Sequence, residues 1–113
     1  VSAPFHCKLM KNATDIMEQE INKINFQKSD KLLISNVTAN EILNNDELKN
    51  LLIKQIESRV RWRESVILMI KNGVSHFIEI GPGKVLSGLI KRINKDVKIN
   101  TINSDIDIKD LKI

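Results

Sequence analysis

A chain of 113 residues is the size of one small domain. Hydrophobic residues make up 42% of it and charged residues 28%, a balance that suits a soluble globular protein and argues against a disordered chain. The net charge of +4 favours acidic partners only mildly, the single cysteine excludes an internal disulfide, and no apolar run approaches the roughly 18 to 20 residues that span a bilayer.

The first half of the chain predicts two helices and one strand. Apolar residues recur every three or four positions over residues 9–24, which predicts a helix with Leu9, Ala13, Met17, Ile21 and Ile24 on one face. The short apolar run LLISNV, residues 32–37, predicts a buried strand. A helix is predicted over residues 46–57, with N-cap candidates at residues 44–46. Its inward face would hold Leu48, Leu51, Leu52 and Ile56.

The second half of the chain predicts a helix with a capping residue at each end, and then a strand, a helix and a strand. Ser58 is placed to cap a helix that Asn72-Gly73 ends, because glycine accepts the left-handed cap conformation. HFIEI, residues 76–80, predicts a strand. The turn Gly81-Pro82-Gly83 leads into a helix that carries Val85, Leu86, Leu89, Ile90 and Ile93. VKINTI, residues 97–102, is the last predicted strand, and the tail from Asn103 predicts a short turn or helix.

The predicted order is helix, strand, two helices, strand, helix, strand. Strands separated by helices require right-handed crossovers and therefore form a parallel sheet, here of three strands. Parallel sheets are normally buried on both faces. We therefore expect residues 1–113 to form part of a single, larger α/β domain, without an internal repeat or linker.

His6 is the first candidate catalytic residue. An imidazole titrates near neutrality, so it can take and return a proton at physiological pH. A lone histidine is more often structural or merely exposed, and the spacing alone leaves both interpretations open. A base also needs a nucleophile, and no serine of this chain lies in a G-x-S-x-G pattern. The reacting partner of His6 is therefore expected in another part of the molecule.

Cys7 and His76 are weaker candidates. Neighbours on an extended segment point to opposite faces, so Cys7 is not expected to pair with the adjacent His6. A metal site made of these three residues has no recognised ligand spacing, and no metal is expected. His76 begins a predicted strand and is expected to be structural.

Two short motifs have both a functional and a structural interpretation. RVRWR, residues 59–63, mixes arginines with an aromatic and can mark nucleic-acid contact. On a helix, however, Trp62 would face the core while the arginines flank it in solvent. GPGK, residues 81–84, is too short for a phosphate-binding loop, and a strand-to-helix turn explains its glycines. The N–H groups at the following helix start remain able to attract an anion.

Two longer stretches resemble a known family. VSAPFHCKLMK, followed later by FIEIGPGKVLSGLIKRI, is similar to the C-terminal part of malonyl-CoA:acyl-carrier-protein transacylase. Between them, Gln55 and the V-x-W of residues 60–62 fall where that family has a glutamine and a similar V-x-W, and Asn36-Val37 also fits. Asn12 and Arg59 stand where the family commonly has prolines. Those prolines would rigidify helix starts, so their loss concerns stability more than chemistry.

The resemblance implies an α/β-hydrolase-like acyltransferase core and a serine-histidine acyl transfer. In the family, a serine attacks the malonyl thioester, and the phosphopantetheine thiol of acyl carrier protein then takes the malonyl group. On this mapping, His6 is the general base, and the backbone carbonyl of Gln55 orients it. Phe5 and Asn36 map to the substrate pocket. The implied substrates are malonyl-CoA and phosphopantetheinyl acyl carrier protein, without a bound cofactor.

The resemblance also implies partners. The family's nucleophile serine lies in an N-terminal portion that these residues do not include, so that portion is the expected partner of this chain, which alone would be inactive. Acyl carrier protein is acidic, and its expected docking site is the basic set of Lys84, Lys91, Arg92 and Lys95. Neither nucleic acid nor a membrane is expected as a partner. The expected location is the cytoplasm, or a plastid if the source has one.

Two other functions stay open. The chain could be a non-catalytic module that binds acyl carrier protein, or a basic nucleic-acid-binding domain. A G-H-S-x-G block upstream in the parent gene would favour the enzyme, and its absence would favour the binding module.

Overall fold

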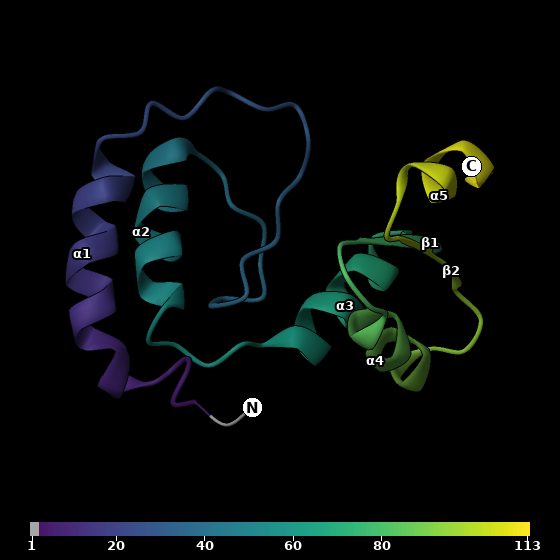
Figure 1. Cartoon of the computed structure of the whole chain (residues 1–113), viewed down its shortest axis with the longest axis horizontal. Coiled ribbons are helices and arrows are strands. Elements are labelled where there is room, and N and C mark those ends of the chain that lie inside the picture. Colours follow the sequence, from purple (N-terminus) through teal and green to yellow (C-terminus); the bar gives the residue numbers. More distant parts are fainter. Residues whose placement is uncertain (1–2) are drawn as a thin grey trace. The chain divides into compact units, whose positions relative to one another are not determined.

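The computed structural model describes residues 3–113, which fall into two compact units (Figure 1). The first unit ends at Ser65 and contains two long helices and their connecting loop. The second unit, Val66–Ile113, contains the sheet. The boundary lies inside the helix α3, Trp62–Lys71.

The first unit opens with a 3-10 turn, η1 (Lys8–Met10), which runs directly into α1 (Lys11–Asn22). The predicted helix over residues 9–24 is therefore present in a shorter form. α1 packs beside α2 (Asn45–Gln55), and the two run side by side in Figure 1. Ile21 of the predicted apolar face is buried, and so is Thr14. Leu9, Met17 and Ile24 of that face are exposed, because within residues 3–113 α1 packs only on the elements α2 and η1.

α2 begins where its capping signal predicts. Asn44 has an extended backbone, and its side-chain oxygen accepts a hydrogen bond from the Glu47 backbone N–H at 2.8 Å. Asp46 and Glu47 lie in the first turn, where the helix dipole favours negative charge. Leu51 is buried on the inward face. The predicted helix and its N-cap are confirmed, with the start one residue earlier.

The predicted strand over residues 32–37 is wrong. Only Ile34 makes a bridge, an isolated antiparallel one to Glu41, and the chain turns back on itself between them. The backbone bonds of this segment are local: the Ser35 N–H donates to Asn40 O at 2.9 Å, and the Ile42 N–H donates to Leu33 O at 2.9 Å. Several polar backbone groups of this segment are thus used inside its own hairpin-like turn.

α3 ends as predicted but starts later. Its C-terminus is a Schellman cap: the Gly73 N–H donates to Ile70 O, the Val74 N–H donates to Met69 O, and Gly73 has a φ of 97°. The helix begins at Trp62, so Ser58 lies too far upstream to cap it, and the expectation for Ser58 is wrong.

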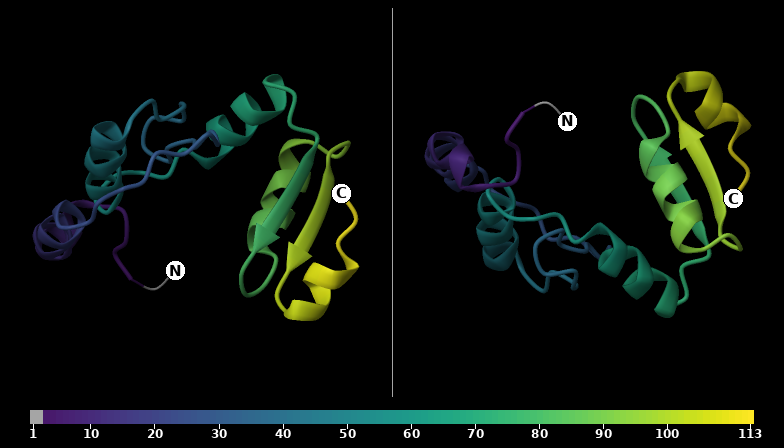
Figure 2. Two further views of the ribbon diagram at one scale, coloured as in Figure 1. Left: turned by 90° about the horizontal axis from the view of Figure 1, so that it is seen from above. Right: turned by 90° about the horizontal axis from the view of Figure 1, so that it is seen from below.

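The second unit is built on two parallel strands, β1 (His76–Ile80) and β2 (Lys98–Ile102). Their register pairs His76 with Lys98 and Ile80 with Ile102. α4 (Val85–Ile93) makes the crossover and lies along the strand pair in both views of Figure 2. A short α5 (Asp105–Asp110) follows β2. The parallel α/β class is therefore confirmed, with two strands among the described residues instead of three.

The two faces of β1 differ in how far a helix covers them. Glu79 bonds to the start of α4, so it lies on the helix-covered side. Ile78 and Ile80 alternate with it and point to the other side, where both are exposed. Parallel strands normally have helices on both faces. Within residues 3–113, the Ile78 and Ile80 side chains of β1 are therefore left exposed on this face.

Candidate active site

His6 lies in a tight turn before η1 and has an unusual backbone conformation. Its φ is 56°, in the left-handed region that costs a non-glycine residue about 1–2 kcal/mol. The Phe5 N–H donates to Ala3 O at 2.9 Å just before it, and the Met10 N–H donates to Cys7 O at 3.0 Å just after it. These local bonds hold the turn, and the imidazole is exposed. Strain of this kind is often found at functional sites.

The imidazole is anchored by the last residue of α2. His6 Nδ1 lies 2.9 Å from the backbone oxygen of Gln55. The last carbonyls of a helix have no partner inside it, so this oxygen is free to accept. A carbonyl cannot donate, so Nδ1 must carry the proton of this bond, and Nε2 is left with a free lone pair. The structure thus brings together the two residues that the family resemblance links, in the geometry of an oriented base. The catalytic role itself stays a prediction.

A hollow of about 140 Å³ lies beside this anchor. It is walled by apolar side chains of α2 and the preceding loop, and two of its polar lining residues are Gln55 and Asn36. Asn36 is therefore placed near the His6 anchor, as a pocket residue would be. Phe5 does not line this hollow and is exposed.

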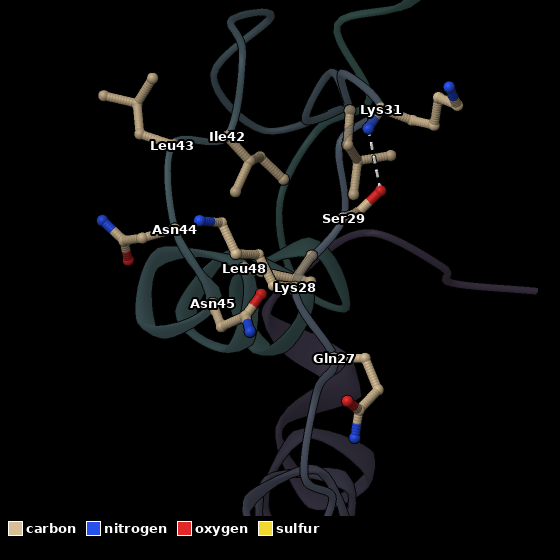
Figure 3. A pocket seen from close by; sticks show the side chains of 10 residues that line it. Gln27, Lys28, Ser29, Lys31, Ile42, Leu43, Asn44, Asn45 and Leu48 are labelled. Atoms are coloured by element: carbon tan, nitrogen blue, oxygen red, sulfur yellow. Dashed lines mark hydrogen bonds between the residues drawn. The ribbon is translucent and has the colours of Figure 1, made fainter.

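A larger hollow, of about 370 Å³, lies between residues 27–31 and the start of α2 (Figure 3). Lys28 reaches across it towards Asn44, while Gln27 points away. Its other polar groups already have partners: Lys31 pairs with Asp30, and the Asn45 amide donates to Phe26 O. Sequence reasoning missed this hollow because the loop that forms it has no periodicity.

The basic residues around α4 have different environments. Lys91 Nζ donates to Val97 O at 2.6 Å and to Lys95 O at 3.1 Å, so it ties the loop after the helix. Lys95 lies beyond the helix end at Ile93. Lys84 precedes the helix and is exposed, as are Arg92 and Lys95. The ammonium of Lys91 is therefore already engaged, unlike a freely available docking charge.

The Gly81-Pro82-Gly83 turn is explained by its backbone. Gly81 has a φ of 136° and Gly83 a φ of 84°, values that favour glycine. The helix N-terminus that follows is occupied by the Glu79 carboxylate, which accepts from Ser87 Oγ at 2.6 Å and from the Ser87 N–H at 2.8 Å. The Ser87 hydroxyl and the N–H groups of Ser87 and Leu86 hold the pKa of the Glu79 carboxyl below its ordinary value. An external anion would have to displace this carboxylate.

Cys7 and His76 are held in other contacts. Cys7 Sγ donates to Pro4 O at 3.2 Å, and His76 Nε2 lies 2.7 Å from Asn100 Oδ1 across the two strands. In the described part of the chain, no three His, Cys, Asp or Glu side chains are grouped as metal ligands. None of its helices combines the length and apolar character that a membrane crossing requires.

Comparisons with known proteins point to one family. No family model matches the chain. A malonyl CoA-acyl carrier protein transacylase from Staphylococcus aureus (strain MSSA476) is 43% identical over 109 residues, which cover 96% of this chain and 35% of that protein. The crystal structure of the transacylase from Clostridium perfringens matches with a TM-score of 0.87 and 39% identity, over 97% of this chain and 35% of that one. A type II PKS acyl-carrier protein in complex with its malonyl-transacylase matches with a TM-score of 0.86 and 33% identity, over 96% and 35%.

The chain therefore shares its parallel α/β fold with solved transacylases and its sequence with curated ones. Over nearly its whole length it corresponds to the C-terminal part of malonyl CoA-acyl carrier protein transacylases, which confirms the resemblance found in its motifs. The chain spans about a third of the length of the curated relatives it matches.

Proposed function

We propose that this chain is the histidine-bearing part of an enzyme that transfers malonyl groups from coenzyme A to the phosphopantetheine thiol of acyl carrier protein, in cytoplasmic fatty-acid biosynthesis. The names of the matched relatives support the reaction. The observation that carries the role of this chain is the bond between His6 Nδ1 and Gln55 O, at 2.9 Å, because it leaves Nε2 free to act as a base.

In the first half of the proposed reaction, a serine hydroxyl from another part of the enzyme gives its proton to His6 Nε2 and attacks the malonyl thioester carbonyl. The carbon–sulfur bond then breaks, and the coenzyme A thiolate leaves with the proton from the imidazolium. The Gln55 carbonyl stabilises that imidazolium, since it lies at a helix C-terminus where the dipole favours positive charge.

In the second half, the phosphopantetheine thiol gives its proton to His6 Nε2 and attacks the malonyl-serine ester. The ester bond breaks, and the serine oxygen takes the proton back. One acyl bond is exchanged for another in each half, so electrons and protons balance without an external oxidant or reductant. The proposed reaction therefore needs no bound cofactor.

The nucleophile has to come from outside these residues. No serine here lies in a nucleophile-elbow pattern, and the matched relatives are about three times as long as this chain. The exposed isoleucine side of β1 supports an additional partner, because a parallel sheet is normally covered on both faces. We propose that the N-terminal portion of the same enzyme covers it and supplies the serine.

Acyl carrier protein is the proposed acceptor. One matched structure is a malonyl-transacylase in complex with an acyl-carrier protein. The four predicted docking residues, Lys84, Arg92, Lys95 and Lys91, are all exposed, but the Lys91 ammonium is held by two carbonyls. We therefore favour the first three for contact with an acidic partner.

The test uses the intact protein that contains this chain, with malonyl-CoA and phosphopantetheinyl acyl carrier protein, and measures malonylated carrier protein by mass spectrometry. His6→Ala is expected to lower the rate by about 10² to 10⁴, the scale of a lost general base. His76→Ala is the matched control, since it removes the other histidine of this chain, and should retain the rate. Equal rates for the two variants would rule out His6 as the base. Carrier-protein binding without transfer in the unsubstituted protein would favour the non-catalytic module.

A further inference from the structure

Arg61 makes an unusual set of contacts with the loop before α2. Its backbone N–H donates to Asn36 O at 2.8 Å, and its side-chain Nη1 donates to Thr38 O at 3.0 Å. One residue thus satisfies two carbonyls of the same turn, from a position more than 20 residues away in the sequence. The guanidinium is itself oriented by Glu64, which accepts from Nε at 2.6 Å.

The turn that Arg61 holds, residues 35–39, bears the polar side of the smaller hollow. Ser35 is buried; its Oγ accepts from the Val37 N–H at 3.1 Å, and its backbone oxygen accepts from the Ala39 N–H at 2.9 Å. Asn36 lines the hollow together with Gln55, whose carbonyl anchors the histidine. The contacts of Arg61 therefore fix where Asn36 stands relative to the proposed acyl-transfer site.

Arg59 offers a close comparison. It reaches the same Glu64 at 3.5 Å, but its side chain is 82% exposed and it has no bond to the turn. The Arg61 side chain is 44% exposed and bonds to both partners. The two arginines share charge, neighbourhood and an acidic partner, but only the Arg61 side chain bonds to Thr38, and it also bonds Glu64 more closely. Replacing Arg61 by alanine removes these side-chain contacts and keeps its backbone bond to Asn36, and Arg59→Ala serves as the control for a lost arginine beside Glu64.

We propose that Arg61 is a positioning residue that sets the shape of the acyl-accepting hollow by pinning the turn of residues 35–39. This inference rests on the proposed function, since it assumes that the hollow takes the short acyl group of a thioester. Arg61 has no bond to His6 or to Gln55, so its loss affects how the acyl group is held and leaves the base in place. The expected signature is therefore a change in KM for the acyl donor with kcat preserved.

The first measurement follows amide hydrogen exchange in the intact protein that contains this chain. Arg61→Ala should speed exchange of the Val37 and Ala39 amides by about tenfold, the factor for one lost charge-assisted hydrogen bond. Arg59→Ala should leave both amides unchanged. Similar rates in the two variants would show that Arg61 does not hold the turn, and the proposal would be overturned whatever the activity.

The second measurement uses the intact protein and its transfer reaction. Arg61→Ala should raise the KM for malonyl-CoA by about fivefold to tenfold with kcat within about twofold, and Arg59→Ala should change neither. A fall in kcat without a change in KM would overturn the assignment to acyl binding. If the unsubstituted protein transfers no malonyl group, the proposed function has failed. The exchange measurement then still decides whether Arg61 pins the turn.

Discussion

Leu51→Ala is expected to destabilise the first unit by about 3 kcal/mol. Leu51 is 7% exposed, so the substitution removes three buried carbon atoms, worth about 2.4 kcal/mol at about 0.8 kcal/mol each. Leu51 also borders the smaller hollow, and the vacated space adds a cavity cost. The total falls within the roughly 2–5 kcal/mol that Leu→Ala changes in cores cost.

The assay is urea unfolding of the chain, followed by tryptophan fluorescence. The chain has one tryptophan, and Trp62 belongs to the first unit, so the signal reports on the unit that contains Leu51. Leu43→Ala is the matched control, because the same atoms are removed from a side chain that is 80% exposed, and it should cost about 0.5 kcal/mol. Equal costs for the two variants would refute the burial of Leu51 against this hollow.

Three further predictions concern other parts of the chain. Because the pKa of Glu79 is lowered on folding, its hydrogen bonds stabilise the second unit above about pH 4.5, and this stabilisation is lost as the pH falls. Glu79→Gln should therefore lower the urea midpoint of unfolding at about pH 7, and the difference in midpoint between the variant and the unsubstituted chain should vanish in acid. In thermal unfolding, Gly73→Ala should lower the free energy of unfolding by about 1 kcal/mol, because alanine is strained at the φ of 97° found there. Gly88→Ala should raise it by about 0.5–1 kcal/mol, because Gly88 lies inside α4 with open space around it. Nitrogen-15 NMR of the chain in alkaline buffer, with the imidazole neutral, should find the proton of His6 on Nδ1; a proton on Nε2 would contradict the Gln55 bond.

The elements with local signals were predictable. α2 has its Asn44 cap and apolar spacing, α3 has a glycine at its end, and the two parallel strands differ from their predicted ranges by at most one residue. Each of these signals lies within a few residues of the structure that it determines. Local chemistry therefore suffices for them.

The failures concern contacts that form only when a turn brings together residues six to eight positions apart. LLISNV, residues 32–37, has the composition of a strand, but a strand also needs a neighbour with free backbone groups, and this segment pairs inside its own turn. The sequence pattern places Glu79 only in a strand, yet its carboxylate accepts from the first turns of α4, because the glycine turn folds the helix start back onto it. The pattern likewise places Lys91 in a basic docking set, whereas its amine holds the loop that leads to β2.

The candidate site shows the same limit. His6 and Gln55 are 49 residues apart, and no periodicity links a histidine in an N-terminal turn to the last carbonyl of α2. Only the family resemblance joined them. Arg61 carried no signal beyond its place in a basic, aromatic motif, since its role depends on the two carbonyls of a turn that the sequence did not predict.

The central claim is that His6, oriented by the Gln55 carbonyl, is the base of the acyl transfer. Rapid-quench measurement of acyl-enzyme formation from malonyl-CoA, in the intact protein, tests it most directly. We predict that His6→Ala slows this step by about 10² to 10⁴. Gln55→Ala should slow it far less, because that substitution keeps the main-chain oxygen that accepts from His6. Acyl-enzyme formation at the unsubstituted rate in His6→Ala, or an equal loss in Gln55→Ala, would contradict the account.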